Sequence, residues 1–252
     1  MLLQPTLDKL RTMRLTGMAQ ALELQLQQTD VDGLAFEERL GLIVDHEWAC
    51  RQDRRLGRLL KEARLRLAAC TEDLDWRPGR GLDRGVVLRL AACDWIRDGH
   101  QVLISGPTGA GKTFLACALG NAACRQGIST RYYRVPRLLQ DLALARADGS
   151  YARLFAKLAG TKLLILDDWG ITPLSAGDCR DVFELVDDRS PGRSTVVAGQ
   201  LPLDAWHAAM ADPTLADAIL DRLVHGAYKI VLKGESMRKV MRADLSNRPD
   251  MT

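Results

Sequence analysis

Eight consecutive residues of the 252-residue chain carry the chemistry that the rest of the sequence must position. They read Gly106-Pro-Thr-Gly-Ala-Gly-Lys-Thr113 and fit the pattern G-x-x-x-x-G-K-[ST] of a phosphate-binding loop. The glycines let the backbone bend so that successive N–H groups point at phosphate oxygens. Lys112 is expected to reach the β- and γ-phosphates, and Thr113 to hold Mg²⁺ through its hydroxyl. The predicted nucleotide-contacting residues are Gly106, Pro107, Thr108, Gly109, Ala110, Gly111, Lys112, Thr113 and Phe114.

Two adjacent acids form a second polar group. They end the run Leu163-Leu-Ile-Leu-Asp-Asp168, which reads as a buried strand. In a nucleotide-binding sheet such a strand end supplies the carboxylate on the metal side. We therefore expect Asp167 to hold Mg²⁺, directly or through water, and Asp168 to orient or deprotonate the attacking water. The phosphate loop upstream argues against the alternative, in which both acids only cap the turn at 169–173.

Three further polar positions come later in the chain. Gln200 follows a predicted strand over 194–198, where its amide can bond the γ-phosphate or the attacking water, or can merely cap a turn; both readings stay open. Arg222 lies in a predicted helix over 215–224, and the segment 234–239 is basic. An arginine from this region is expected to reach the γ-phosphate of a neighbouring subunit, or of its own, and to offset transition-state charge.

Short apolar strands alternate with helical segments after residue 100, which predicts an α/β fold with a doubly wound parallel sheet. A helix is expected directly after the phosphate loop, as the motif requires. The predicted strands cover 101–105, 130–133, 162–166, 194–198 and 229–232, and the later helices cover 136–147, 151–158, 177–189 and 215–224.

The first 75 residues predict a smaller, all-helical domain. Apolar residues recur at helical spacing over 6–28, with Thr6 as a plausible N-cap, and again over 36–67, as one long helix or two. An acidic stretch and a Pro-Gly turn between residues 72 and 81 look like a linker, and a further helix is expected over 86–96. The predicted domains are therefore a helical domain over 1–75 and a second domain, which includes the linker helix, over 76–252.

A basic stripe lies within the second helical segment. Its members step by three and four residues and so share one helix face. One interpretation is a surface that neutralises DNA phosphates, and the other is a solvated helix face; we favour DNA, because two intervening acids do little to break this face. The stripe comprises Arg51, Arg54, Arg55, Arg58 and Lys61.

Composition sets outer limits on these interpretations. The net charge of +3 is too small to imply a nucleic-acid partner by itself. Six cysteines without a C-x-x-C pair read as reduced core residues, which suits a cytoplasmic protein. The N-terminus lacks an export signal and no apolar run is long enough to span a membrane. His46-Glu47 resembles the start of a zinc-protease motif, but position 50 is Cys, so no metal beyond Mg²⁺ is expected.

These segments together resemble those of the IstB-like transposition helper ATPases, which belong to the AAA+ class and are related to DnaC-type helicase loaders. The likeness runs almost end to end. The blocks that carry it are Leu15-Thr-Gly-Met-Ala19, Phe36-Glu-Glu-Arg-Leu40, Arg54-Arg-Leu-Gly-Arg-Leu-Leu-Lys-Glu-Ala63, the phosphate loop with Phe114-Leu-Ala-Cys-Ala-Leu119, Asp167-Asp-Trp-Gly170, Ala216-Asp-Ala-Ile-Leu-Asp-Arg-Leu223 and Gly234-Glu-Ser-Met-Arg-Lys239.

The resemblance implies an AAA+ P-loop ATPase domain behind a helical domain that binds DNA and self-associates. It implies a protein that uses ATP and Mg²⁺ to assemble as a higher oligomer on double-stranded DNA, and that delivers this DNA to an integrase-like transposase. It places Gln200 at the sensor-1 position, Arg222 near the arginine finger and Arg238 near the sensor-2 arginine. Gly199 and Gly226 depart from the family pattern, where a hydroxyl residue and an asparagine are usual.

Two other functions compete with this interpretation. A helicase loader would bind a replicative helicase and single-stranded DNA, and a nucleotide-gated scaffold would use ATP for assembly and hardly hydrolyse it. An adjacent integrase-like reading frame would favour transposition.

Overall fold

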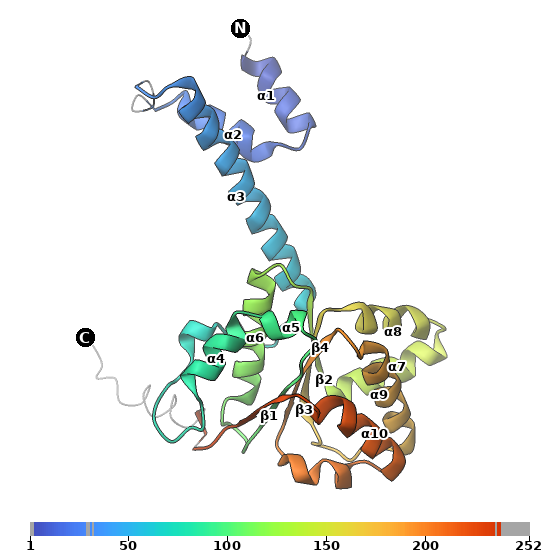
Figure 1. The fold of residues 1–252 in the computed structure, drawn as a ribbon. Coiled ribbons are helices and arrows are strands. Elements are labelled where there is room, and N and C mark those ends of the chain that lie inside the picture. The colour runs from blue at the N-terminus through green and yellow to red at the C-terminus, as the bar shows by residue number, and fades with distance from the viewer. Residues whose placement is uncertain (1–2, 29–30, 32, 235, 238–252) are drawn as a thin grey trace, which may run out of the picture. The chain divides into compact units, whose positions relative to one another are not determined.

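The computed structural model describes residues 3–28, 31, 33–234 and 236–237 (Figure 1). They form two compact units, which divide between Arg58 and Leu59, upstream of the boundary expected from composition near residue 75. The helices that begin in the first unit are α1 (Leu3–Thr12), α2 (Thr16–Gln25) and α3 (Phe36–Ala63), and α3 continues into the second unit as one uninterrupted helix.

The single helix expected over 6–28 is instead two helices, and Thr6 lies inside α1 rather than at its N-cap. The break falls at Arg14, whose φ of 60° is left-handed and cannot continue a right-handed helix. Apolar spacing alone missed this break, because the periodicity continues across it. The reason for the break lies in a contact from α3.

The buried Glu47 of α3 caps the start of α2. The N-cap residue of α2 is Leu15, whose side chain cannot accept a hydrogen bond. The Glu47 carboxylate takes that role, because its Oε2 accepts the N–H groups of Gly17 at 2.7 Å and Met18 at 3.1 Å. A Cβ on Gly17 would lie 2.8 Å from the Glu47 Cα, so only glycine allows this approach of α2 to α3.

The second unit is built on a parallel sheet. The described residues form five strands: β1 (Val102–Ser105), β2 (Thr130–Arg134), β3 (Leu163–Trp169), β4 (Ser194–Gly199) and β5 (Tyr228–Val231). The helices are α4 (Arg84–Ala91), α5 (Asp94–Arg97), α6 (Lys112–Arg125), α7 (Val135–Ala147), α8 (Tyr151–Gly160), α9 (Ala176–Arg189) and α10 (Pro213–Val224), and 3-10 turns cover Thr71–Asp73, Leu203–Ala205 and His207–Ala209.

The predicted strands and the doubly wound topology are confirmed. One expected helix differs, because the segment 86–96 is divided at Cys93, whose φ is 66°. The strand order is β2-β3-β4-β1-β5 and all pairs are parallel. This order places β4 between β1 and β3, so the loop after β1 and the ends of β3 and β4 meet at one edge of the sheet.

Alternate residues of each strand feed two separate cores. In β1, Val102 and Ile104 pack into the cluster that includes α4, α5 and α6, whereas Leu103 packs into the cluster formed with α7, α8, α9 and α10. Figure 1 shows the two groups of helices on opposite faces of the sheet. Because both faces are covered, the residues of the three central strands β1, β3 and β4 are almost all buried, and these strands contain the apolar runs that the sequence revealed. Within the described part of the chain, no helix combines the length and the apolar character needed to cross a membrane.

We expect Glu47→Gln to loosen the first unit. The pKa of Glu47 is lowered, mainly by the hydrogen bond from Arg51. The carboxylate therefore stabilises the fold at pH values above its unfolded pKa of about 4.3. This stabilisation is lost as the pH falls through the lower pKa of the folded state. Loss of the charged cap should lower the free energy of opening α2 by about 2 kcal/mol at pH 7. This corresponds to roughly thirtyfold faster amide exchange in α2.

Hydrogen–deuterium exchange of peptides from α2 measures this effect. Asp53→Asn, an exposed acid on the same helix, is the matched control and should leave exchange unchanged. Equal exchange in Glu47→Gln and wild type would show that α2 does not depend on this cap.

Candidate nucleotide site

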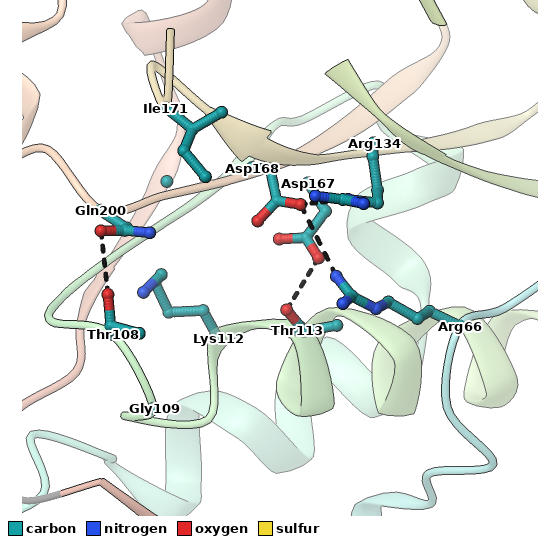
Figure 2. Close-up of a pocket in the computed structure, with 11 residues that line it drawn as sticks. Arg66, Thr108, Gly109, Lys112, Thr113, Arg134, Asp167, Asp168, Ile171 and Gln200 are labelled. Carbon is teal, nitrogen blue, oxygen red and sulfur yellow. Dashed lines mark hydrogen bonds and ion pairs between the residues drawn. The ribbon is translucent and has the colours of Figure 1, made fainter. Parts of the chain in front are cut away.

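The predicted polar residues of the phosphate loop and of the strand ends meet in a pocket of about 210 Å³ at the carboxyl edge of the sheet. The phosphate loop, between β1 and α6, forms one wall, and the ends of β2, β3 and β4 form the other (Figure 2). The lining residues are Arg66, Thr108, Gly109, Lys112, Thr113, Arg134, Asp167, Asp168, Ile171, Gly199 and Gln200.

The phosphate loop has the backbone shape that its glycines predict. Gly106 has a φ of 147° and Gly111 a φ of 96°, and a Cβ on Gly106 would lie 2.4 Å from a carbonyl oxygen of Leu232. The Lys112 ammonium donates to the carbonyl oxygens of Gly106 at 2.8 Å and Pro107 at 2.9 Å. Burial lowers the pKa of Lys112. The ammonium is thus held over the loop, where phosphate oxygens can replace the carbonyls as acceptors.

Asp167 joins three elements of the site. Its carboxylate is buried, and Oδ2 accepts hydrogen bonds from the Thr113 hydroxyl of α6 and the Tyr132 hydroxyl of β2, each at 2.7 Å. Burial, followed by the hydrogen bond to Asp167, raises the pKa of Tyr132, so its hydroxyl stays protonated and donates. Thr113 and Asp167, the two predicted metal ligands, are therefore brought together as sequence reasoning expected.

These two oxygen ligands suit Mg²⁺. Mg²⁺ binds through one or two protein oxygens and completes its shell with phosphates and water. The described residues contain no cluster of three or more His, Cys, Asp or Glu side chains of the kind that holds a metal without phosphate. The donor set therefore fits a cation that arrives with a nucleotide.

Asp168 differs from Asp167 in both backbone and partners. Its φ of 60° is left-handed, and it lies where the pairing of β3 with β4 shifts register between Leu166 and Trp169. A non-glycine residue in this region is held there by its surroundings, which is common at functional sites. The Asp168 carboxylate forms ion pairs with Arg134, at the end of β2, and with Arg66, whose Nη1 lies 3.6 Å from Oδ2. Both guanidiniums point at this carboxylate in Figure 2.

Gln200 lies directly after β4 and faces the phosphate loop. Its side-chain oxygen accepts the Thr108 hydroxyl at 2.9 Å, which turns the amide toward the loop and leaves its NH₂ group for another acceptor. Gly199 precedes Gln200 and departs from the family pattern. A steric contact explains why this position is glycine. A Cβ there would lie 2.8 Å from the carbonyl oxygen of Trp169, so the turn of β3 requires glycine.

The arginines predicted for the γ-phosphate lie outside this pocket or outside the described residues. Arg222, on α10, donates to the Asp187 carboxylate at 2.7 Å and lies over the Phe183 ring, 4.9 Å from its centre. It does not line the pocket of its own chain. Arg238 lies outside the described residues. Any role of Arg222 at a γ-phosphate therefore requires another subunit.

Phe114, predicted to contact nucleotide, lines a separate pocket of about 80 Å³. Leu74, Leu82 and Gly111 also line this pocket, which is mostly apolar. Asp73, Asp75, Arg80 and Met237 complete its lining. The Arg80 guanidinium donates to the carbonyl oxygen of Ala110 at 2.7 Å and so holds the phosphate loop in place. The loop therefore has a polar pocket and an apolar pocket next to it.

The five residues of the basic stripe are all exposed on α3. Two of these residues also form ion pairs with Glu47. The guanidinium of Arg51 lies 2.7 Å from the Glu47 carboxylate, and that of Arg54 lies 3.7 Å from it. No carboxylate of the described residues forms an ion pair with Arg58 or Lys61. Sequence reasoning did not identify Glu47 as a partner, because its burial is set by α2.

Sequence reasoning missed Ile171, which lines the pocket, and three polar residues of the site. Tyr132 and Arg134 belong to β2, and a charged residue at a strand end was the available signal for Arg134. Arg66 lies within the helical segment predicted over 36–67, and nothing in its spacing indicates a pocket.

Comparisons with known proteins agree with this geometry. Residues 8–244 match the family described as IstB-like ATP binding protein. An insertion sequence ATP-binding protein of Sinorhizobium fredii is 50% identical over 242 residues, which cover 96% of this chain and 99% of that protein.

Two solved structures share the fold. The crystal structure of DnaI matches with a TM-score of 0.58 and 19% identity, covering 66% of this chain and 92% of that one. The replication initiator DnaA bound to AMPPCP and single-stranded DNA matches with a TM-score of 0.58 and 17% identity, covering 73% and 56%. The second unit thus has the AAA+ P-loop fold.

We expect Lys112→Ala to weaken nucleoside triphosphate binding, because it removes the charged donor that the phosphates would use. One lost charge-assisted contact corresponds to roughly 10- to 100-fold in affinity. Titration with a fluorescent ATP analogue measures it, and Lys157→Ala, an exposed lysine on α8, is the control. Unchanged affinity in Lys112→Ala would show that the phosphate loop does not bind the nucleotide.

Proposed function

The chain belongs to the family of IstB-like ATP binding proteins, and we propose that it is a magnesium-dependent ATPase of insertion-sequence transposition. In this proposal it assembles as a higher oligomer on double-stranded DNA and delivers that DNA to, or stimulates, an integrase-like transposase. The observation that carries the ATPase activity is the 2.7 Å contact between Thr113 of the phosphate loop and Asp167 of β3, which brings the two metal-side oxygens together.

ATP binding in the proposal uses both pockets. Backbone N–H groups of the phosphate loop and the Lys112 ammonium hold the phosphates in the polar pocket, and the apolar pocket beside Phe114 receives the base. Thr113 and Asp167 hold Mg²⁺, whose charge neutralises the β- and γ-oxygens when it is bound.

Hydrolysis is assigned to the residues on the opposite wall. Asp168 orients the attacking water or accepts its proton, which requires its carboxylate to be released from at least one of its arginine partners. Gln200, anchored through its oxygen by Thr108, presents its NH₂ group to the γ-phosphate or to the water. Arg222 offsets transition-state charge in a neighbouring subunit after it exchanges its Asp187 partner for phosphate.

DNA binding is assigned to the basic stripe on α3. Five exposed cations within 11 positions of one helix suit a row of phosphates, which carry one charge per about 1.7 Å of duplex. Because the relative from Sinorhizobium fredii is named for an insertion sequence, transposition is preferred to helicase loading. The likeness to DnaI supports the fold alone, since only 19% of residues are identical.

We expect Asp168→Asn to bind ATP near normally and to hydrolyse it at least about 100-fold more slowly, because asparagine keeps the size but cannot accept the proton of the water. Steady-state turnover and ATP-analogue affinity measured on the same preparation separate the two effects. Wild-type turnover in this variant would exclude Asp168 from the chemistry.

We expect replacement of Arg54, Arg55 and Arg58 with Ala to weaken binding to all DNA sequences alike. Phosphate contacts release counterions, so the slope of log affinity against log salt should fall in magnitude by about 2 to 3. Fluorescence anisotropy at several salt concentrations measures it, with ATP and with ADP. Binding should be tighter with ATP, because subunit association multiplies the DNA contacts.

A matched triple variant separates this effect from a general loss of charge. Arg89, Arg153 and Arg180 are exposed arginines on α4, α8 and α9, and their replacement with Ala removes the same charge from other surfaces. Equal affinity and slope in the two triple variants would mean that the stripe does not hold DNA.

A further inference from the structure

Arg66 reaches the nucleotide pocket from an unexpected part of the chain. It is the third residue after Ala63, where α3 ends, and lies outside the sheet and the phosphate loop. Its Nη1 nevertheless lies 3.6 Å from the Asp168 carboxylate. A hydrogen bond between the Arg66 side chain and Tyr132 is the largest cause that raises the pKa of Arg66. Figure 2 shows the guanidinium pointing toward the Asp168 carboxylate.

These contacts connect Arg66 to both strand-end acids. One path runs directly to Asp168. The other runs through the Tyr132 hydroxyl, which donates to the buried Asp167 carboxylate at 2.7 Å. The two acids need compensating positive charge, since both carboxylates are largely removed from water.

The pocket provides three cations for this purpose, and they are not equivalent. The Lys112 ammonium donates to two carbonyl oxygens of its own loop. Arg134 and Arg66 pair with Asp168, and Arg66 alone of these two is also bonded to Tyr132. Of the two arginines, Arg66 is therefore the one that is linked to Asp167, through the Tyr132 hydroxyl.

We propose that Arg66 is a displaceable counter-ion of this site, which holds Tyr132 and Asp168 while the site is empty and leaves them when a magnesium–nucleoside triphosphate binds. The inference rests on the proposed nucleotide binding. A divalent cation at Thr113 and Asp167 repels a guanidinium one hydroxyl away and makes its charge superfluous. Departure of Arg66 also frees one side of the Asp168 carboxylate.

This exchange makes Arg66 a positioning residue with a direct link along the chain. The segment 64–70 continues from α3, and Arg66 is its contact with Asp168 and Tyr132. Occupancy of the nucleotide site thus changes how firmly the residues after α3 are held.

The first test is the Mg²⁺ requirement for binding of a fluorescent ATP analogue. Arg66→Gln removes a cation that competes with Mg²⁺, so the half-saturating Mg²⁺ concentration should fall by about threefold or more. Arg66→Lys keeps the charge and should stay near wild type. Arg64→Gln removes an equal charge two residues away, outside the pocket, and should have no effect.

The second test uses the wild-type protein and so does not depend on how a variant folds. Amide hydrogen exchange in residues 64–70 should be faster with ATP and Mg²⁺ than with ATP and a chelator, because the ion pair between Arg66 and Asp168 is broken.

The outcomes separate the two proposals. An unchanged or higher Mg²⁺ requirement in Arg66→Gln, or slower or equal exchange of residues 64–70 with Mg²⁺, overturns the displacement of Arg66 and leaves the ATPase intact. A wild-type protein that does not bind the analogue with Mg²⁺ overturns the proposed function itself.

Discussion

The buried carboxylate of Asp167 is the interaction on which the nucleotide site depends. It accepts hydroxyl groups from Thr113 at the start of α6 and from Tyr132 in β2, so one side chain ties the phosphate loop to two strands. A buried carboxylate without such donors would be costly, and this cost holds the three elements in register. The strand order makes the contact possible, because β4 separates β1 from β3 and leaves room for a ligand between the loop and the strand ends.

Asp168, the next residue, shows how neighbours along one strand can take opposite roles. Asp167 is enclosed and hydroxyl-bonded, whereas Asp168 turns through a left-handed conformation into the open part of the pocket, toward Arg66 and Arg134. The register shift at the end of β3 lets both side chains point into the pocket, which the alternation of a regular strand would prevent. Two acids with different surroundings can therefore come from adjacent positions and face the same pocket.

The first unit uses a buried carboxylate in a different way. Glu47 caps α2 and pairs with Arg51 and Arg54, so part of the charge of the basic stripe serves the fold. A stripe that looks uniform in sequence is therefore uneven, with Arg58 and Lys61 furthest from this carboxylate along the helix. At one end of α3, two arginines of the proposed DNA-binding stripe therefore also stabilise the fold.

The parallel sheet, the phosphate loop and the placing of Thr113 and Asp167 at one site could be predicted from the amino-acid sequence. These features depend on local order along the chain: apolar runs that must be buried on both faces, glycines that permit one backbone shape, and acids that directly follow a strand. Three other features follow from tertiary contacts: residues 6–28 break at Arg14, Arg222 pairs with Asp187, and Arg66 enters the nucleotide pocket. Each of these outcomes is set by a partner distant in sequence, such as Glu47 for the break before α2, and periodicity or charge spacing contains no information about such a partner.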